Sequence, residues 1–259
     1  MAIKQSVCIP MVKPASIPLE EFIEKVAEMD YPAVEIWLRD SQFDILVALA
    51  TKFGLSIASM IGHDASKGGL NDPASHDQIE VDLRASIDVA ADAGIPGLIC
   101  FSGKRREGLS EQEGIAHTVT GLRRLAPYAE KKGINLNLEL LNSKVDHPGY
   151  QCDHTAWGRK VVEEVDSPRV KLLYDIYHMQ IMEGDVIRTI RDTIGWIGHF
   201  HAAGVPGRHE IDETQELNYA AVARAISATP YDLYLGQEFS PLGDIYESLR
   251  RAYAICNQT

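Results

Sequence analysis

Apolar and polar positions along this chain follow two patterns that take turns from one end to the other. Short, largely apolar runs of the kind that form buried strands lie around Val7 and at 33–37, 55–62, 97–102, 134–141, 170–175, 196–202 and 234–239. Between them, segments such as 19–29, 77–92, 110–132 and 155–165 repeat apolar residues every three or four positions, which is the period of an amphipathic helix. The pattern predicts eight strands, each followed by a helix.

Eight such units in 259 residues indicate one closed barrel. A (β/α)8 TIM barrel is typically about 250 residues long, and we see no linker, low-complexity segment or close repeat that divides the chain. No GxGxxG motif follows the first strand, so an open dinucleotide-binding sheet lacks its main support. Gly54, Gly94 and Gly133 follow helical segments and predict left-handed C-caps. We therefore expect an α/β protein with a single TIM-barrel domain over residues 1–259.

Charge and cysteine usage narrow the classes of partner. With 25 basic and 37 acidic residues the net charge is −12, which argues against nucleic-acid binding because that affinity comes from Lys and Arg on phosphates. The four cysteines are scattered without a CxxC pair, and no secretory leader or apolar run of membrane-spanning length is present. We expect a soluble cytoplasmic protein that acts on a small molecule, and the surface is compatible with a homo-oligomer.

Candidate chemistry gathers near the ends of the last four predicted strands. Glu139, Asp175, His201 and Glu238 stand there, separated by 36, 26 and 37 residues, each gap about one strand, one helix and two loops. Buried charges are costly unless something pairs with them, and a divalent metal ion would pair with all four. A single glutamate at a strand end is more often solvated or a cap, so the prediction depends on the set. Mixed carboxylate and imidazole ligands suit Mn²⁺, Mg²⁺, Co²⁺ or Zn²⁺.

Polar residues around this set are candidates for substrate binding. His178 lies three residues beyond Asp175, and Arg208 and Glu210 lie in the loop after the His201 strand. An arginine there could hold a carboxylate or hydroxyl in bidentate fashion, and a surface salt bridge is the alternative.

Three residues of the early strands are further candidates. His63 follows the third strand and is either a satisfied rim histidine or a binding residue. Glu35 belongs to an interior polar network or to the pocket wall. Trp37 stacks on a substrate or fills the barrel mouth.

Several blocks between residues 134 and 241 resemble hydroxypyruvate isomerases of the xylose isomerase-like superfamily of TIM barrels. These blocks read ELLNSKVDHPGY, YDIYHMQIMEGD, GHFHAAGVPGRHE followed by ELNY, and GQEFSP. The resemblance implies that Glu139 and Glu238 are both metal ligands and the acid/base pair. It also implies that Asp175 and His201 complete the metal shell and that His178 and Arg208 contact substrate oxygens.

The resemblance implies proton transfer beside a carbonyl through a metal-stabilised enediolate, on hydroxypyruvate or a related small oxo-acid or sugar. Where hydroxypyruvate isomerases commonly resemble HVQ, this chain reads HFH with His201, which is similar to ketose 3-epimerases of the superfamily. A ketose 3-epimerase is therefore the alternative enzyme, and a non-catalytic metal-binding barrel is an alternative of another class. The DNA-repair endonucleases of the superfamily need additional His and Asp ligands and a basic surface, which this acidic chain does not show.

Overall fold

The computed structural model describes residues 2–258, and their eight strands form one closed parallel barrel in the order β1-β2-β3-β4-β5-β6-β7-β8. This arrangement confirms the α/β barrel that the alternating pattern predicts. By their contacts the residues divide into two compact units, one of residues 1–60, 185–194 and 200–259 and one of residues 61–184 and 195–199. The single-domain expectation for residues 1–259 stays a prediction. Among the described residues no helix is both long and apolar enough to cross a membrane.

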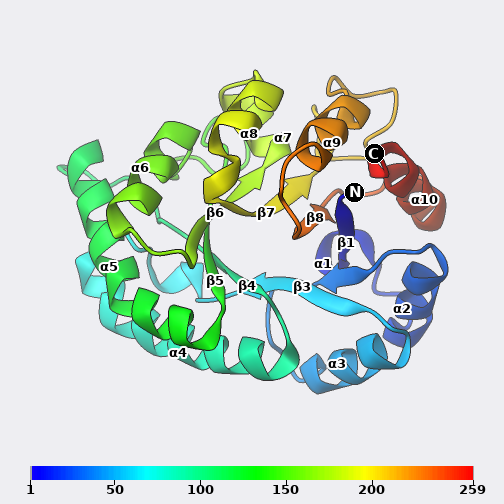
Figure 1. Ribbon diagram of the computed structural model, residues 1–259, viewed down its shortest axis with the longest axis horizontal. Helices are drawn as coiled ribbons and strands as arrows, with labels where there is room; N and C mark the ends of the chain where they lie inside the picture. The colour runs from blue at the N-terminus through cyan, green and yellow to red at the C-terminus, as the bar shows by residue number, and fades with distance from the viewer. Residues whose placement is uncertain (1, 259) are drawn as a thin grey trace. The chain divides into compact units, whose positions relative to one another are not determined.

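The first unit holds both ends of the chain. Its strands and helices are β1 (Lys4–Cys8), α1 (Ile9–Val12), α2 (Leu19–Glu28), β2 (Ala33–Glu35), α3 (Phe43–Lys52), all but the last residue of β3 (Ser56–Ile61), α8 (Val186–Thr193), the second half of β7 (Ile197–Ala202), α9 (Tyr219–Ser227), β8 (Tyr234–Gln237) and α10 (Ile245–Cys256). Strand β1 pairs with β2 on one side and with β8 on the other, so the beginning and the end of the chain meet in the sheet (Figure 1).

The second unit holds the middle of the chain. It contains the short 3-10 helices η1 (Ala65–Lys67) and η2 (Pro73–Ser75), then α4 (His76–Ala93), β4 (Gly97–Cys100), α5 (Glu111–Lys132), β5 (Asn135–Glu139), α6 (Thr155–Val165), β6 (Val170–Asp175) and α7 (Ile176–Met182). The 3-10 helix η3 (Ile194–Trp196) is divided between the units: its first residue belongs to the first unit and the other two belong to the second. Helices α4, α5 and α6 lie on the outer side of strands β4, β5 and β6 (Figure 1).

Helix α4 illustrates how the apolar period becomes packing. Ile79, Leu83, Ile87 and Ala90 are buried and lie on one face because they are three or four residues apart. The helix ends at Gly94, whose φ of 70° is left-handed and whose N–H bonds to the Ala90 carbonyl. Gly54 and Gly133 are also left-handed, with φ of 73° and 76°. The three predicted helix ends are therefore confirmed.

Strand β5 alternates two kinds of buried residue. Leu136 and Leu138 alternate with polar Asn135, Asn137 and Glu139, and all five are buried. Glycines make room for the polar face: a Cβ at Gly97 would lie 2.5 Å from the Asn137 amide nitrogen, and one at Gly198 2.1 Å from its oxygen. Side chains on alternate positions of a strand share a face, so Glu139 lies on the same face as Asn137. The barrel therefore has a polar interior layer that leads to Glu139.

Candidate functional site

His201 and Glu238 form a buried pair at the carboxyl ends of β7 and β8. His201 is the second-last residue of β7, and Glu238 directly follows β8. The strand register aligns His201 with Gly236, so Glu238 lies two residues beyond its partner position and on the same face as Gly236. The His201 Nδ1 and Glu238 Oε2 atoms are 3.2 Å apart.

Glu35 at the end of β2 orients this histidine. Its Oε2 lies 3.0 Å from His201 Nε2, and its Oε1 accepts a hydrogen bond from the Ser6 hydroxyl. A Cβ at Gly236 would lie 2.2 Å from Glu35 Oε1, so the glycine makes room for this carboxylate. Glu35 therefore belongs to an interior polar network, one of its two sequence alternatives. When Nε2–H donates to a carboxylate, Nδ1 keeps its lone pair, as in metal-binding histidines.

Three further side chains from the same unit contact Glu238. The Trp37 indole N–H donates to Oε1 over 3.2 Å, and the Arg208 guanidinium donates to Oε2. The Cys8 thiol lies 3.8 Å from Oε1, and burial together with the charge of Glu238 raises the pKa of that thiol well above its usual value. The Cys8 thiol therefore stays neutral beside the carboxylate. Trp37 and Arg208, two of the predicted substrate contacts, hold Glu238 in place here.

Arg208 adopts an uncommon backbone conformation to make this contact. Its φ of 59° lies in the left-handed region, which costs a residue other than glycine roughly 1 kcal/mol or more. The loop fixes the residue from both sides, because its N–H donates to the Gly204 carbonyl over 2.9 Å and its carbonyl accepts from the Ser240 N–H over 2.8 Å. Strain of this kind concentrates at functional sites.

Glu139 and Asp175 form the corresponding pair at the ends of β5 and β6. The register aligns Glu139 with Leu173, so Asp175 again lies two residues beyond the partner position. Both side chains are buried, Glu139 with 4% and Asp175 with 1% of its surface exposed. The pairs on β5/β6 and on β7/β8 thus repeat one stagger, which a barrel with sheared strands produces.

Asp175 also begins helix α7 and positions His178. Its Oδ1 accepts a hydrogen bond from the His178 backbone N–H over 3.0 Å, as an N-cap does. The His178 Nε2 atom lies 3.5 Å from the other Asp175 oxygen, and the Asn142 amide nitrogen lies 2.6 Å from His178 Nδ1. An amide that donates to Nδ1 leaves the proton on Nε2, which then faces Asp175.

Sequence reasoning missed the residues that support this second pair. Asn142 also donates to Asp146, whose carboxylate accepts from the Tyr177 hydroxyl over 2.8 Å. The Tyr150 hydroxyl donates to the Glu139 carbonyl over 3.0 Å. For Asn142, Asp146 and Tyr150 the signal is their place in the block from 142 to 153, a long polar loop soon after the Glu139 strand, whereas Tyr177 lies in α7.

The remaining predicted contacts, His63 and Glu210, have structural partners. His63 is 3% exposed, its Nε2 accepts from the Phe101 N–H over 3.0 Å, and burial lowers its pKa to about 4. The His63 ring must be neutral for its Nε2 atom to accept this hydrogen bond. Glu210 Oε1 accepts from the backbone N–H groups of Leu242 and Gly243 over 2.7 and 3.1 Å, which fastens the loop before α10. A substrate contact for either residue stays a prediction.

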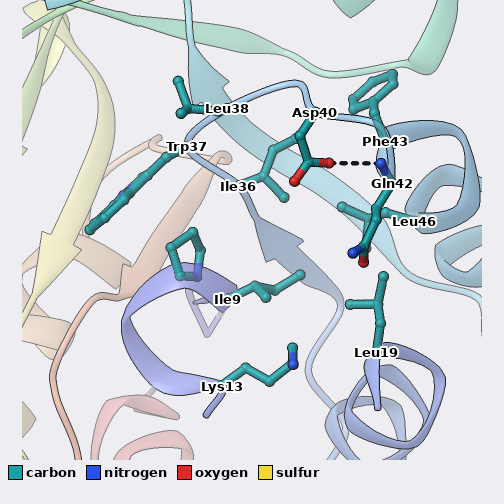
Figure 2. A pocket seen from close by; sticks show the side chains of 11 residues that line it. Ile9, Lys13, Leu19, Ile36, Trp37, Leu38, Asp40, Gln42, Phe43 and Leu46 are labelled. Carbon is teal, nitrogen blue, oxygen red and sulfur yellow. Dashed lines mark hydrogen bonds between the residues drawn. The ribbon is translucent and has the colours of Figure 1, made fainter. Parts of the chain in front are cut away.

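An apolar pocket of about 320 Å³ lies behind Trp37. Figure 2 shows Ile9, Ile36, Phe43 and Leu46 around it, while the Trp37 ring points away from these residues. Trp37 therefore both lines this pocket and donates its indole N–H to the Glu238 carboxylate.

Two groups of described residues have the chemistry of metal ligands. One consists of Glu139, Asp175, His201 and Glu238, and the other of Glu35, His199 and His201, and all of these residues are buried. Three carboxylates and one imidazole suit a divalent cation that prefers oxygen and nitrogen ligands. The donor set of the first group therefore fits such an ion, and the four residues are those predicted from the sequence.

The sequence of this chain is similar to those of known isomerases. A hydroxypyruvate isomerase from Escherichia coli is 32% identical over 169 residues, covering 65% of each chain. A 2-oxo-tetronate isomerase from Cupriavidus necator is 37% identical over 113 residues, covering 44% of this chain and 43% of that one. The chain thus spans less than two thirds of the length of these curated relatives.

Solved structures share the fold over nearly the whole chain. An AP endonuclease of family 2 from Brucella melitensis superposes with a TM-score of 0.86 at 25% identity, covering 98% of each chain. A D-psicose 3-epimerase from Clostridium cellulolyticum H10 superposes with a TM-score of 0.81 at 18% identity, also covering 98% of each chain. The sequence pattern of the xylose isomerase-like TIM barrel family matches residues 23–255. The chain therefore belongs to the xylose isomerase-like TIM barrel family.

Proposed function

We propose that this protein is a divalent-metal-dependent isomerase of hydroxypyruvate or a related small oxo-acid or sugar. One observation carries the proposal: four buried side chains with the chemistry of metal ligands stand at the carboxyl ends of β5, β6, β7 and β8, and two of them are glutamates. The names of the relatives support the reaction class, since they include isomerases of hydroxypyruvate and of 2-oxo-tetronate.

Glu139, Asp175, His201 and Glu238 would hold the metal ion in this proposal. When bound, such an ion supplies Lewis-acid polarisation of a substrate carbonyl and its neighbouring hydroxyl, which makes the adjacent C–H more acidic. Glu35 keeps Nδ1 of His201 available as a ligand atom by accepting from Nε2. The residues at the ends of four strands thus serve one purpose.

Glu139 and Glu238 move the proton in this mechanism. One carboxylate removes a proton from the carbon beside the carbonyl, and the other returns one, as positioned general acid/base groups do. The hydrogen bonds from Trp37 and Arg208 hold Glu238 in a fixed orientation. Arg208 and His178 also provide N–H donors for substrate oxygens. Isomerisation results when the proton returns to the neighbouring carbon.

Replacement of the two glutamates tests the proposal. Glu139→Gln and Glu238→Gln keep the side-chain volume and remove the base, so each should reduce turnover by at least 10²-fold while circular dichroism shows a folded barrel. Activity is followed as solvent-deuterium incorporation by NMR, in D₂O with Mn²⁺, across small keto-acids, tetroses, pentoses and hexoses. The exposed Glu24→Gln serves as the matched control. Wild-type rates in either site variant would refute the proposed roles.

A ketose 3-epimerase is the second candidate, favoured by His201 at the position where the chain departs from the hydroxypyruvate isomerase pattern. The two reactions differ in where the proton returns. Deuterium at C3 of a recovered ketose, with the carbonyl unmoved, identifies an epimerase. Deuterium at the end carbon next to a displaced carbonyl identifies an isomerase.

A further inference from the structure

A second pocket, separate from the apolar one behind Trp37, opens between three loops at the carboxyl ends of β3, β4 and β5. Its volume is about 610 Å³. The residues that line it come from 65–72, 101–106 and 141–150, all within the second compact unit. Among them are two cations, Lys104 and Arg106, and one acid, Asp72.

The backbone of this pocket is firmly held. The buried Asn71 amide donates to the Lys104 carbonyl over 2.8 Å and to Gln151 over 2.7 Å, and Lys104 forms an antiparallel bridge with Tyr150. Gly69 and Gly103 pack so closely that a Cβ at Gly69 would lie 2.2 Å from the Gly103 Cα. The loop therefore presents Lys104 from a fixed position.

The charges that line the pocket leave one positive charge uncompensated. Arg106 and Asp72 form an ion pair of 2.6 Å and neutralise each other. The Lys104 ammonium makes no hydrogen bond or ion pair within residues 2–258, although its backbone is anchored. A single free ammonium matches one carboxylate better than a phosphate dianion, which would require a second cation.

The pocket adjoins the Glu139 and Asp175 end of the proposed site. His147 lines the pocket, and its ring centroid lies 5.2 Å from that of His178. His178 in turn lies 3.5 Å from Asp175, while Tyr150, another lining residue, donates to the Glu139 carbonyl. Two imidazole rings thus stand between the pocket and Asp175. Lys104 lines this pocket and forms no ion pair with Glu139 or Asp175, so the pocket suits a carboxylate that lies several bonds from the reacting carbonyl.

We propose that this pocket binds a carboxylate at the far end of an open-chain sugar acid and that Lys104 is its recognition residue. This inference rests on the proposed function, because it places the reacting carbonyl at the metal-ligand residues. It narrows the substrate class to keto-sugar acids whose carboxylate is several bonds from the carbonyl. Lys104 then distinguishes such acids from the neutral ketose of the same length.

Matched ligands test the proposal directly. D-fructuronate differs from D-fructose only in the oxidation of its far-end carbon to a carboxylate, and D-fructose 6-phosphate places a phosphate at that end. Isothermal titration of the Mg²⁺-loaded protein with each ligand should give at least tenfold tighter binding of fructuronate than of fructose, as expected for one charge-assisted hydrogen bond. Equal affinities, or tighter binding of the phosphate, would overturn the carboxylate assignment.

Variants of Lys104 test whether this residue causes the preference for fructuronate over fructose. Lys104→Met should reduce the fructuronate-to-fructose ratio to within about twofold, and Lys104→Arg should retain most of it because the charge remains. Lys160→Met removes a charge that is also exposed, on α6, and should leave the ratio unchanged. Thermal unfolding checks that all variants fold. A preference that persists in Lys104→Met would refute the role of this residue.

Deuterium exchange on the same samples keeps the two proposals apart. Absence of exchange with every ketose and oxo-acid would remove the proposed function, while a Lys104-dependent affinity ratio would still support the pocket. Exchange that depends on Glu139, together with a ratio that ignores Lys104, would support the function and remove the pocket assignment.

Discussion

Among individual residues, the buried imidazoles of His201 and His63 have different neighbours. His201 has Glu35 at Nε2 and Glu238 at Nδ1, so carboxylates flank both of its ring nitrogens. His63 has no carboxylate at hydrogen-bond distance among the described residues, and burial lowers its pKa to about 4. Its neutral Nε2 accepts the Phe101 N–H, so protonation would break that hydrogen bond.

The low pKa of His63 predicts an acid-dependent loss of stability. The folded-state pKa of about 4 lies below the ordinary value of 6.5, so the unfolded chain binds the proton more readily. The contribution is fully present above pH 6.5 and is lost as the pH falls through 4, and the loss reaches about 3 kcal/mol at pH 4. Urea unfolding of wild type and His63→Gln between pH 7 and 4 measures it. Parallel pH profiles for the two proteins would contradict the assignment.

The sequence predicts the identity of the candidate ligands but only part of their surroundings. Glu139, Asp175, His201 and Glu238 could be found because strand ends recur at regular spacing. The contacts of Glu238 with Trp37 and Arg208 join residues 201 and 30 positions apart, which spacing along the chain does not encode. Spacing along the chain does not encode the contacts of Glu210 either, because its partners, Leu242 and Gly243, lie in a later loop.

At the scale of elements, Asp175 joins the candidate site to a helix. It is the last residue of β6 and the N-cap of α7, so one carboxylate both faces the site and begins a helix. The two functions use different properties of the side chain. The cap needs an oxygen that accepts the His178 N–H, whereas a metal ion needs the negative charge.

Two substitutions of Asp175 should separate these functions. Asp175→Asn keeps an acceptor oxygen for the cap, while Asp175→Ala removes it, so alanine should reduce the unfolding free energy of chelator-treated protein by about 1 kcal/mol more than asparagine. Both should weaken Mn²⁺ binding by at least tenfold, because both remove the charge. Urea unfolding and calorimetric titration measure the two effects. Equal stability of the variants would show that α7 does not depend on this cap.

Helices were predicted more accurately than strand ends for a physical reason. The helix predicted at 155–165 is observed as Thr155–Val165, and the one predicted at 77–92 as His76–Ala93. The strands predicted at 33–37 and 97–102 are shorter, ending at Glu35 and Cys100. Apolar residues continue past the last ladder hydrogen bond into the loops, so hydropathy overestimates strand length. The segment between the strand predicted at 55–62 and the helix predicted at 77–92 contains η1 and η2, whose short turns lack a clear apolar period.

At the scale of the whole molecule, the net charge and the family membership restrict the function together. The AP endonuclease from Brucella melitensis shares the fold of this chain. The net charge of −12 on this chain, however, disfavours the phosphate contacts that dominate nucleic-acid affinity. The isomerases from Escherichia coli and Cupriavidus necator are matched over only part of their length. The family therefore fixes the barrel, while the choice of substrate depends on the loops at the carboxyl ends of the strands.

Metal binding should appear as a change in the stability of the entire chain. An ion that binds only the folded state stabilises it by about 2.7 kcal/mol at a concentration one hundred times its dissociation constant. For a chain of this size that corresponds to a rise in Tm of roughly 5–10 °C. We expect excess Mn²⁺ to produce such a rise in chelator-treated protein, measured by differential scanning calorimetry, and EDTA to reverse it.

The variant Glu35→Gln tests whether the Mn²⁺-dependent rise in Tm arises from binding at the proposed ligands. It leaves Glu139, Asp175, His201 and Glu238 in place but weakens the acceptor that orients His201, and loss of such a partner typically costs 10- to 100-fold in metal affinity. The Mn²⁺ concentration that gives half of the full rise in Tm should increase accordingly, with Glu24→Gln unchanged. If both variants respond to Mn²⁺ as the wild type does, His201 is not oriented by Glu35 for metal binding.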